Sequence, residues 1–134
     1  MDDLPLKPGD AFTRDFAVTA EVHSGFVALF GDRNPLHVDP AFARGKGFAS
    51  EVMHGNILNG FLSFFVGECL PIKNVILQSQ EIQYRKPVYL GETLTLRAEV
   101  VDVSPAVGSA GLRFTFVDRS GQKVANGKLQ LGVL

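Results

Sequence analysis

A carboxyl and an imidazole side chain stand five residues apart in the segment Phe30-Gly31-Asp32-Arg33-Asn34-Pro35-Leu36-His37. Asn34-Pro35 is typical of a rigid turn, so Asp32 and His37 should share one stiff loop. Carboxyl and imidazole groups can both exchange protons near neutral pH, as general acid–base chemistry requires. A second imidazole, His54, precedes Gly55 at the start of an apolar segment. The sequence therefore predicts proton transfer on a ligand that carries an apolar tail.

The same residues also have plainer interpretations. Asp32 and Asn34 are common turn residues after a helix, and His54 could be only a structural residue at a helix start. His23 is expected to be a surface residue of a helix. His37 and His54 could bind a metal ion with Asp39, but the spacing fits no zinc pattern, so no metal is predicted.

Length and composition restrict the class of protein. The chain has 134 residues, which is the usual size of one domain, so we expect residues 1–134 to form a single domain. A formal net charge of −1 argues against strong non-specific binding to nucleic acid or to an anionic membrane. The first residues lack the pattern of a signal peptide, and no stretch is long and apolar enough to span a bilayer. We therefore expect a cytoplasmic protein.

The elements that position the loop follow from the spacing of apolar residues. A short strand is predicted over residues 12–18, followed by a helix with Thr19 as N-cap that runs to about Phe30. Gly31 is well placed as the C-cap residue. Residues 32–40 should be irregular because they contain two prolines, and Pro40 should open a second short helix.

The longest helix should begin near His54-Gly55 and end before Pro71. It is apolar on nearly every side, which is typical of a buried helix. Alternating side chains predict strands over residues 75–84, 93–103, 112–116 and 123–131. Adjacent strands joined by turns form an antiparallel sheet with one solvated face. The predicted fold class is α+β, with the sheet curled around the long helix.

The loop motif, with Ala41 after it, resembles the corresponding motif of the MaoC-like (R)-specific enoyl-CoA hydratase/dehydratase family. His54-Gly55 at the helix entrance and the turn at residues 86–92 are also similar to this family, in the same order along the chain. The resemblance implies a hot-dog fold, in which an antiparallel β-sheet wraps around a long central α-helix. It also implies a homodimer whose two sheets join edge to edge.

The resemblance further implies the activity. The family hydrates trans-2-enoyl-CoA reversibly to (R)-3-hydroxyacyl-CoA, which would make the chain a hydro-lyase of fatty acid metabolism that needs no cofactor. The catalytic pair would be Asp32 and His37. The backbone N–H of Gly55 would bind the thioester oxygen as an oxyanion donor, and Asn34 would shape the loop.

The resemblance also assigns roles to residues of the central helix and its entrance. Ser63 and Val66 would line the acyl pocket, and His54 at the helix entrance is expected to contact substrate. Asn59 and Gly60 are poor helix formers to which the resemblance assigns no role. Four basic residues could meet the phosphates of coenzyme A or could form a solvated face: Arg44, Lys46, Arg85 and Lys86.

Other functions stay open at this point. A 3-hydroxyacyl-[acyl-carrier-protein] dehydratase would use the same loop, and a basic rim around the site would favour that carrier. A non-catalytic acyl-thioester-binding hot-dog module would have no use for both Asp32 and His37. A thioesterase normally places its carboxylate on the long helix, where the chain has Glu68 near the far end. Chain length, carrier and pathway stay open, as do the assignment of the base and the contribution of a partner subunit.

Overall fold

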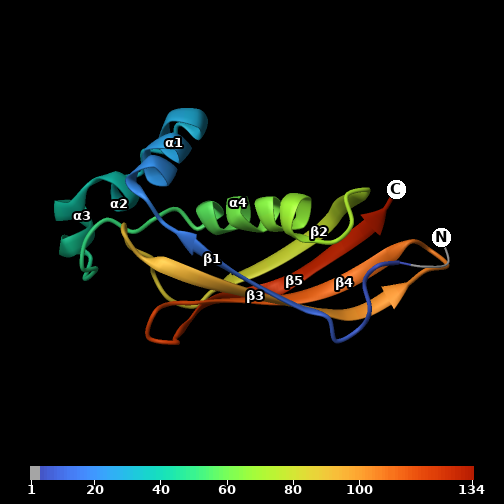
Figure 1. Cartoon of the computed structure of the whole chain (residues 1–134). Helices are drawn as coiled ribbons and strands as arrows, with labels where there is room; N and C mark the ends of the chain where they lie inside the picture. Colours follow the sequence, from blue (N-terminus) through green and yellow to red (C-terminus); the bar gives the residue numbers. More distant parts are fainter. Residues whose placement is uncertain (1–3) are drawn as a thin grey trace.

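A five-stranded antiparallel sheet lies beneath a central helix in the computed structural model, which describes residues 4–134 (Figure 1). The strands are β1 (Ala11–Ala17), β2 (Val75–Tyr84), β3 (Thr93–Ser104), β4 (Ser109–Val117) and β5 (Lys123–Val133). Their order across the sheet is β1-β3-β4-β5-β2, so β1 and β2 form its edges. The predicted α+β class is confirmed.

The central helix is α4 (Asn56–Phe64), which continues as the π-helical segment η1 (Phe65–Cys69) and ends before Pro71 as predicted. Three further helices, α1 (Ala20–Phe30), α2 (Pro35–Val38) and α3 (Pro40–Gly45), gather at one end of the sheet. Figure 1 shows α1 projecting away from the sheet, whereas α4 lies along it. The site loop is therefore held at the end of the molecule where α1, α2 and the start of α4 meet.

The core lies between α4 and one face of the sheet. Alternate side chains of β3 are buried, as predicted, and the same pattern continues in β4. Burial of such side chains stabilises the fold by about 1.5–3 kcal/mol each, because apolar surface leaves water. The buried residues of these two strands and of α4 include Leu94, Leu96, Val100, Leu112, Phe114, Phe116, Ile57, Leu58 and Leu62.

The ends of α1 follow the sequence prediction. The Thr19 side chain accepts a hydrogen bond from the Val22 N–H at 3.1 Å, and Gly31 ends the helix with φ 75°. Glycine adopts this left-handed conformation without the steric cost that a Cβ atom would bring. No residue of α1 is fully buried, and Leu29 and Phe30 are 81% and 72% exposed. Local caps therefore define the ends of this helix, and Val22 and Phe26 supply partly buried contacts with the core.

Two expectations were wrong. Residues 32–40 are not irregular throughout, since Pro35–Val38 form the single helical turn α2. Proline is tolerated at the first position of a helix, where its missing N–H would have no partner in any case. Moreover, α4 is not buried all round: Asn56, Gly60 and Ser63 are exposed along one face, because the sheet covers only the opposite side. Within residues 4–134, no helix is long and apolar enough to span a membrane.

Candidate active site

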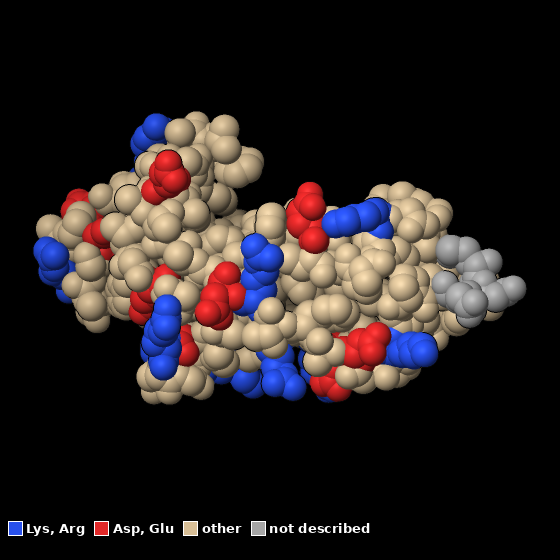
Figure 2. Space-filling view, in the orientation of Figure 1, with Lys and Arg blue, Asp and Glu red and all other residues tan. Residues whose placement is uncertain are grey.

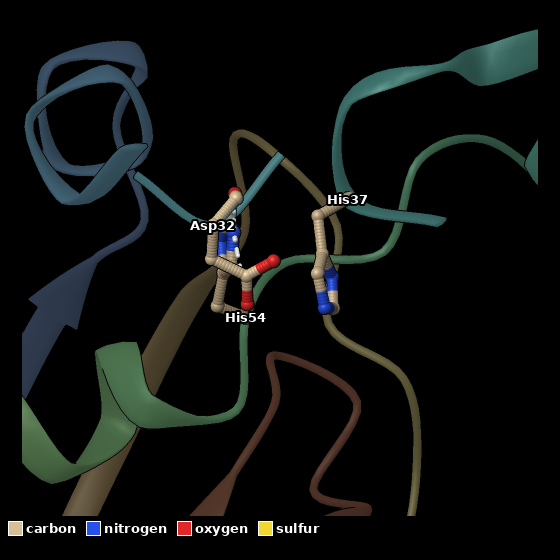
Figure 3. A group of neighbouring side chains, drawn as sticks. All are labelled: Asp32, His37 and His54. Carbon is tan, nitrogen blue, oxygen red and sulfur yellow. Dashed lines mark hydrogen bonds and ion pairs between the residues drawn. The ribbon is translucent and has the colours of Figure 1, made fainter. Parts of the chain in front are cut away.

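Three polar side chains from separate segments converge beside the start of α4 (Figure 3). Asp32 comes from the loop after α1, His37 from α2, and His54 from the segment that leads into α4. Each offers one ligand-capable atom, and these atoms lie within 4.8 Å of one another. The fold thus brings together the carboxylate and both imidazoles that the sequence singled out.

Local hydrogen bonds shape the loop between Asp32 and His37. The Asp32 carboxylate accepts from the Asn34 N–H at 3.1 Å, and the Asn34 side chain accepts from the Leu36 N–H at 3.0 Å. Asn34 is thereby the N-cap of α2, with Pro35 at the first helical position. Asparagine is among the best N-cap residues, since its short side chain reaches the free N–H groups of the first turn. One turn of helix then carries His37 back toward Asp32.

The hydrogen-bond partner of His37 fixes which of its ring nitrogens is free. Nδ1 lies 2.8 Å from the carbonyl oxygen of Val52, which can only accept, so Nδ1 carries a proton. The neutral ring therefore presents an unprotonated Nε2. A histidine held in this tautomer can act as a general base through Nε2.

His54 is almost fully buried, with 3% of its surface exposed. Its Nε2 donates to the carbonyl oxygen of Asp32 at 2.9 Å, and its ring stacks on that of His37 with centroids 4.1 Å apart. Burial is the main reason that the pKa of His54 is lowered; the hydrogen bond to Asp32 opposes this, and the nearby His37 adds to it. The lowered pKa favours a neutral His54 ring, which places no positive charge against His37.

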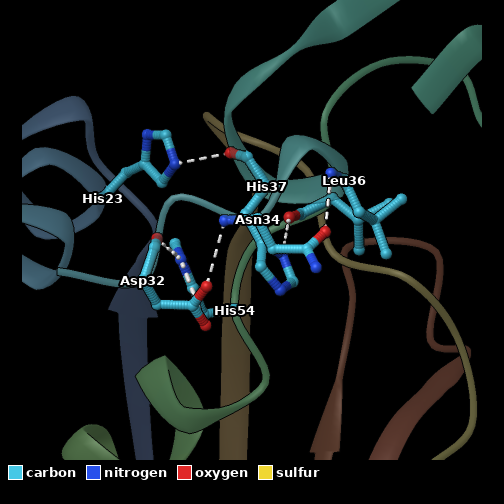
Figure 4. Close-up of polar contacts among 7 residues, drawn as sticks. His23, Asp32, Asn34, Leu36, His37 and His54 are labelled. Carbon is cyan, nitrogen blue, oxygen red and sulfur yellow. Dashed lines mark hydrogen bonds and ion pairs between the residues drawn. The ribbon is translucent and has the colours of Figure 1, made fainter. Parts of the chain in front are cut away.

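The structure adds one residue that the sequence did not assign to the site. His23 of α1 is half-buried, and its Nε2 donates to the carbonyl oxygen of His37 at 2.9 Å (Figure 4). The expectation of a surface residue is therefore wrong. One weak signal exists in the sequence: Phe26 lies three residues on, hence on the same helix face, and its ring packs 4.6 Å from that of His54.

Two histidines thus hold the backbone of the catalytic candidates. His54 binds the carbonyl group of Asp32, and His23 binds the carbonyl group of His37. Figure 4 shows both contacts on either side of the loop. Because the two carbonyl groups belong to the residues whose side chains converge, these contacts limit how far Asp32 and His37 can move apart.

Gly55 stands where α4 begins, directly after His54. The first N–H groups of an α-helix have no partner within the helix, and no backbone acceptor for the Gly55 N–H lies among residues 4–134. The Tyr84 ring packs on this glycine so closely that a Cβ atom at position 55 would lie 2.7 Å from Cζ of the tyrosine. A side chain at position 55 would therefore force the Tyr84 ring to move, whereas glycine permits this close contact, and the N–H of Gly55 is available to a ligand oxygen.

Two hollows flank the converging side chains. The smaller, of about 400 Å³, has His37, His54 and Gly55 among its lining residues. The larger, of about 710 Å³, lies between α1 and α4 and has Asp32 on its edge. We call it the α1–α4 hollow. Its apolar lining residues are Val22, Phe26, Leu29, Phe30, Ile57 and Phe61.

The two residues expected in an acyl pocket lie further along the helix. Ser63 is exposed and follows Asn56 and Gly60 of the α1–α4 hollow at helical spacing, so it lies on the same face of α4. Val66 is 6% exposed and belongs to the core. Neither residue lines one of the two hollows.

The basic residues near the smaller hollow have partners within the chain. Lys86 donates to Asp118 and to Gln122, at 2.5 Å and 2.6 Å, and this contact with Lys86 is the main reason that the pKa of the Asp118 carboxyl lies well below its usual range. Arg85 donates to the side chains of Asn126 and Gln83. Figure 2 shows charges of both signs interspersed over one face of the molecule.

The three converging groups could also surround a metal ion, as far as distance alone is concerned. However, His54 Nε2 and His37 Nδ1 each donate a hydrogen bond to a carbonyl oxygen, so neither of these nitrogen atoms has a free lone pair for a metal ion. A metal bound through either atom would break a bond that holds the loop. The donor set therefore fits proton transfer better than metal binding.

A sequence profile described as "MaoC like domain" matches residues 7–110. The chain belongs to the MaoC-like domain family. An (R)-specific enoyl-CoA hydratase of Aeromonas caviae is 41% identical over 81 residues, which cover 60% of each protein. A 3-hydroxybutyryl-CoA dehydratase of Methylorubrum extorquens is 33% identical over 91 residues, which cover 68% of this chain and 58% of the relative. Each match thus spans about three fifths of the relative.

Solved structures identify the fold of this MaoC-like chain. An (R)-hydratase from A. caviae involved in PHA biosynthesis superposes with a TM-score of 0.90 at 28% identity, covering 98% of this chain and all of the other. The five-stranded sheet around α4 is therefore a hot-dog fold, as the sequence resemblance implied.

Proposed function

We propose that this MaoC-like chain is an enzyme that adds water reversibly to trans-2-enoyl-CoA and forms (R)-3-hydroxyacyl-CoA. The observation that carries the proposal is the convergence of the Asp32 carboxylate and the His37 ring, with Nδ1 of that ring committed to Val52. The (R) configuration and the thioester substrate are inferred from the similar (R)-specific enoyl-CoA hydratase of A. caviae.

In the proposed reaction, one water molecule lies between Asp32 and His37. Its oxygen attacks C3 of the enoyl group while His37 Nε2 accepts one of its protons. Asp32 accepts the other O–H as a hydrogen bond and so orients the attack. One proton then passes from the pair to C2, which restores both side chains. The N–H of Gly55 stabilises the negative charge that develops on the thioester oxygen, since free donors at a helix start favour anions.

The hollows suggest how the substrate lies. With the thioester at Gly55, the acyl chain would run into the apolar α1–α4 hollow and along the exposed face of α4 that carries Ser63. The smaller hollow would receive the pantetheine arm. His54 lines this smaller hollow, where it could contact the substrate as predicted. This contact and the role of Val66 in the acyl pocket stay predictions. The absence of a cofactor and the cytoplasmic location also stay predictions.

We also propose that residues 1–134 act as one domain within a homodimer. The sheet ends in two strands, β1 and β2, that each pair on one side only. Unpaired strand edges tend to associate, and Ile76 and Leu77 on β2 are 52% and 37% exposed. Light scattering should therefore give twice the mass of the chain.

A dehydratase for an acyl-carrier-protein thioester is less well supported. An acidic carrier protein would bind to a basic rim, but Lys86 is neutralised by Asp118, which leaves Arg85, bonded to the neutral Asn126 and Gln83, as the unneutralised basic residue of the smaller hollow. A matched pair of assays with one acyl group on coenzyme A and on the carrier protein separates the two substrates. A higher kcat/KM for the carrier-protein thioester would reverse our assignment.

The decisive test is the loss of enoyl-thioester absorbance when the protein meets crotonyl-CoA, with the product then offered to an (R)-specific dehydrogenase. Asp32→Asn and His37→Ala should each lower kcat by at least about 100-fold, the usual contribution of general acid–base catalysis. Asp39→Asn is the matched control, because Asp39 caps α3 and asparagine caps equally well. Full activity of either site variant would exclude the proposed pair, and binding without turnover by the natural sequence would favour a non-catalytic module.

A further inference from the structure

Two helices each place a glycine on the α1–α4 hollow. Gly25 is the sixth of eleven residues in α1, and Gly60 is the fifth of nine in α4. Both line the hollow that has Asp32 on its edge. Glycine within a helix lowers stability relative to alanine, because it gives up more backbone freedom on folding and buries no side chain.

Nothing within the fold requires glycine at these two positions. A Cβ atom added to Gly25 or to Gly60 would meet no other atom within 4 Å. Neither residue has a positive φ angle, so L-amino acids can adopt its conformation. Gly55 is the contrast on the same helix, since a Cβ atom there would collide with Tyr84. Packing within the described residues therefore does not account for glycine at 25 and 60, and both positions, unlike the equally unobstructed Gly67, line the hollow.

We propose that Gly25 and Gly60 set the width of the acyl site, and that this width serves a branched or ring-bearing acyl group. The proposal rests on the proposed function, in which the thioester lies beside Asp32. A straight chain would need the length of the hollow, whereas glycine on both helices adds width. The occupant is substrate because Asp32 opens onto the same hollow, and the aromatic lining from Phe26, Phe30 and Phe61 suits a bulky apolar group.

The test narrows the hollow from each side. Gly25→Leu and Gly60→Leu are assayed with crotonyl-CoA, with a straight eight-carbon enoyl-CoA, and with an enoyl-CoA that ends in a cyclohexyl ring. The natural sequence should prefer the cyclohexyl substrate to the straight one. Each leucine variant should lower kcat/KM for the cyclohexyl substrate by at least about tenfold, within the range for steric discrimination in an apolar pocket. Each variant should lower kcat/KM for crotonyl-CoA by a smaller factor than for the cyclohexyl substrate, because a four-carbon acyl group fills less of the hollow.

Two further variants distinguish the effect of a narrower hollow from a loss of helix stability. Gly60→Ala should raise the unfolding temperature by about 3 °C, since alanine favours the helix and meets no obstacle. Gly67→Leu is the matched control, because Gly67 is exposed, equally unobstructed, and lies outside the hollow. Its substrate preference should equal that of the natural sequence.

The outcomes distinguish this proposal from the failure of the proposed function. Equal losses for all three substrates, or no change in preference, would overturn the width proposal. So would a change in molar mass of the leucine variants by light scattering, because the hollow would then be a contact between two copies. If no enoyl thioester is turned over, calorimetry with a saturated cyclohexyl acyl-CoA still measures whether the hollow binds a ring-bearing acyl group. Binding that is weakened in both leucine variants would support the acyl site while the hydratase assignment fails.

Discussion

The sheet with α4 and the segment from α1 to α2, which we call the site segment, are stabilised by different interactions. In β3 and β4, alternate side chains are buried completely, including Leu96, Phe114 and Phe116. In α1 and α2, by contrast, no residue is fully buried. These two helices depend on caps, on hydrogen bonds from histidine rings to backbone carbonyl groups, and on the partly buried Val22 and Phe26 that pack against the core.

This difference separates stability from catalytic geometry. A buried apolar side chain contributes about 1.5–3 kcal/mol, whereas a typical hydrogen bond contributes about 0.5–1.5 kcal/mol net. Loss of one contact in the site segment should therefore leave the domain folded. It can still displace Asp32 or His37, and small displacements in an active site reduce the rate strongly. We expect mutations in the sheet to lower stability and mutations in the site segment to lower activity.

The largest effect on stability is expected for Phe116→Ala. Phe116 is completely buried in β4 and packs edge-on against Phe114 with ring centroids 6.0 Å apart. Removal of the ring leaves a cavity, so the free energy of unfolding should fall by about 3–5 kcal/mol, as measured by urea denaturation. The kcat of the fraction that stays folded should change less than twofold, since Phe116 lines neither hollow.

Phe30→Ala is the matched substitution in the site segment. Phe30 is 72% exposed, so the same change should cost less than about 1 kcal/mol. An equal loss of stability for the two variants would show that the two regions do not differ as described.

The sheet could be predicted from the sequence because its pattern is local and repetitive. The alternation in Leu94, Leu96 and Ala98 assigns one face to the core, and the strands fell within a few residues of the predicted bounds. The extent of the helical segment from the start of α4 to the end of η1 was also apparent, although its π-helical last part was not predicted. Its exposed face was not, because apolar residues surround this helix and periodicity alone does not show which side the sheet covers.

The site could be predicted only in part. The spacing of Asp32, Asn34 and His37 indicated the loop, since cap and turn residues act over a few positions. The role of His23 was missed because its partner, the carbonyl group of His37, lies 14 residues away and a backbone acceptor has no sequence signature. The close contact of Tyr84 with Gly55 is likewise a property of the folded chain.

A smaller effect, on activity rather than stability, is expected for His23→Leu. Leucine cannot donate to the His37 carbonyl group, so the catalytic ring loses one restraint on its position. We expect kcat to fall about tenfold, equivalent to about 1.4 kcal/mol and within the net value of one hydrogen bond, with KM unchanged. Steady-state kinetics with crotonyl-CoA measure both constants.

His23→Gln serves as the matched control, because its amide N–H can donate to the same carbonyl group. It should keep kcat within threefold of the natural sequence. If glutamine and leucine lower kcat equally, or if KM rises in step, the hydrogen bond does not position His37.

The smallest effect is expected in the pH dependence of stability, and it comes from the one buried histidine of the site. Burial lowers the pKa of His54 in the folded chain from its ordinary value of 6.5. Below pH 6.5 the unfolded chain therefore binds a proton that the folded chain excludes. The contribution of His54 to stability is complete above pH 6.5 and is lost as the pH falls from there toward the lowered pKa. The slope of the unfolding free energy against pH cannot exceed about 1.4 kcal/mol per pH unit for one proton.

His54→Gln keeps an N–H donor for the Asp32 carbonyl group but does not titrate, so the unfolding free energy of this variant should fall less steeply as the pH is lowered over this range. Urea denaturation at a series of pH values measures the two slopes. Equal slopes would mean that His54 accepts its proton as readily in the folded chain as in water, and a positive charge would then lie beside the His37 ring.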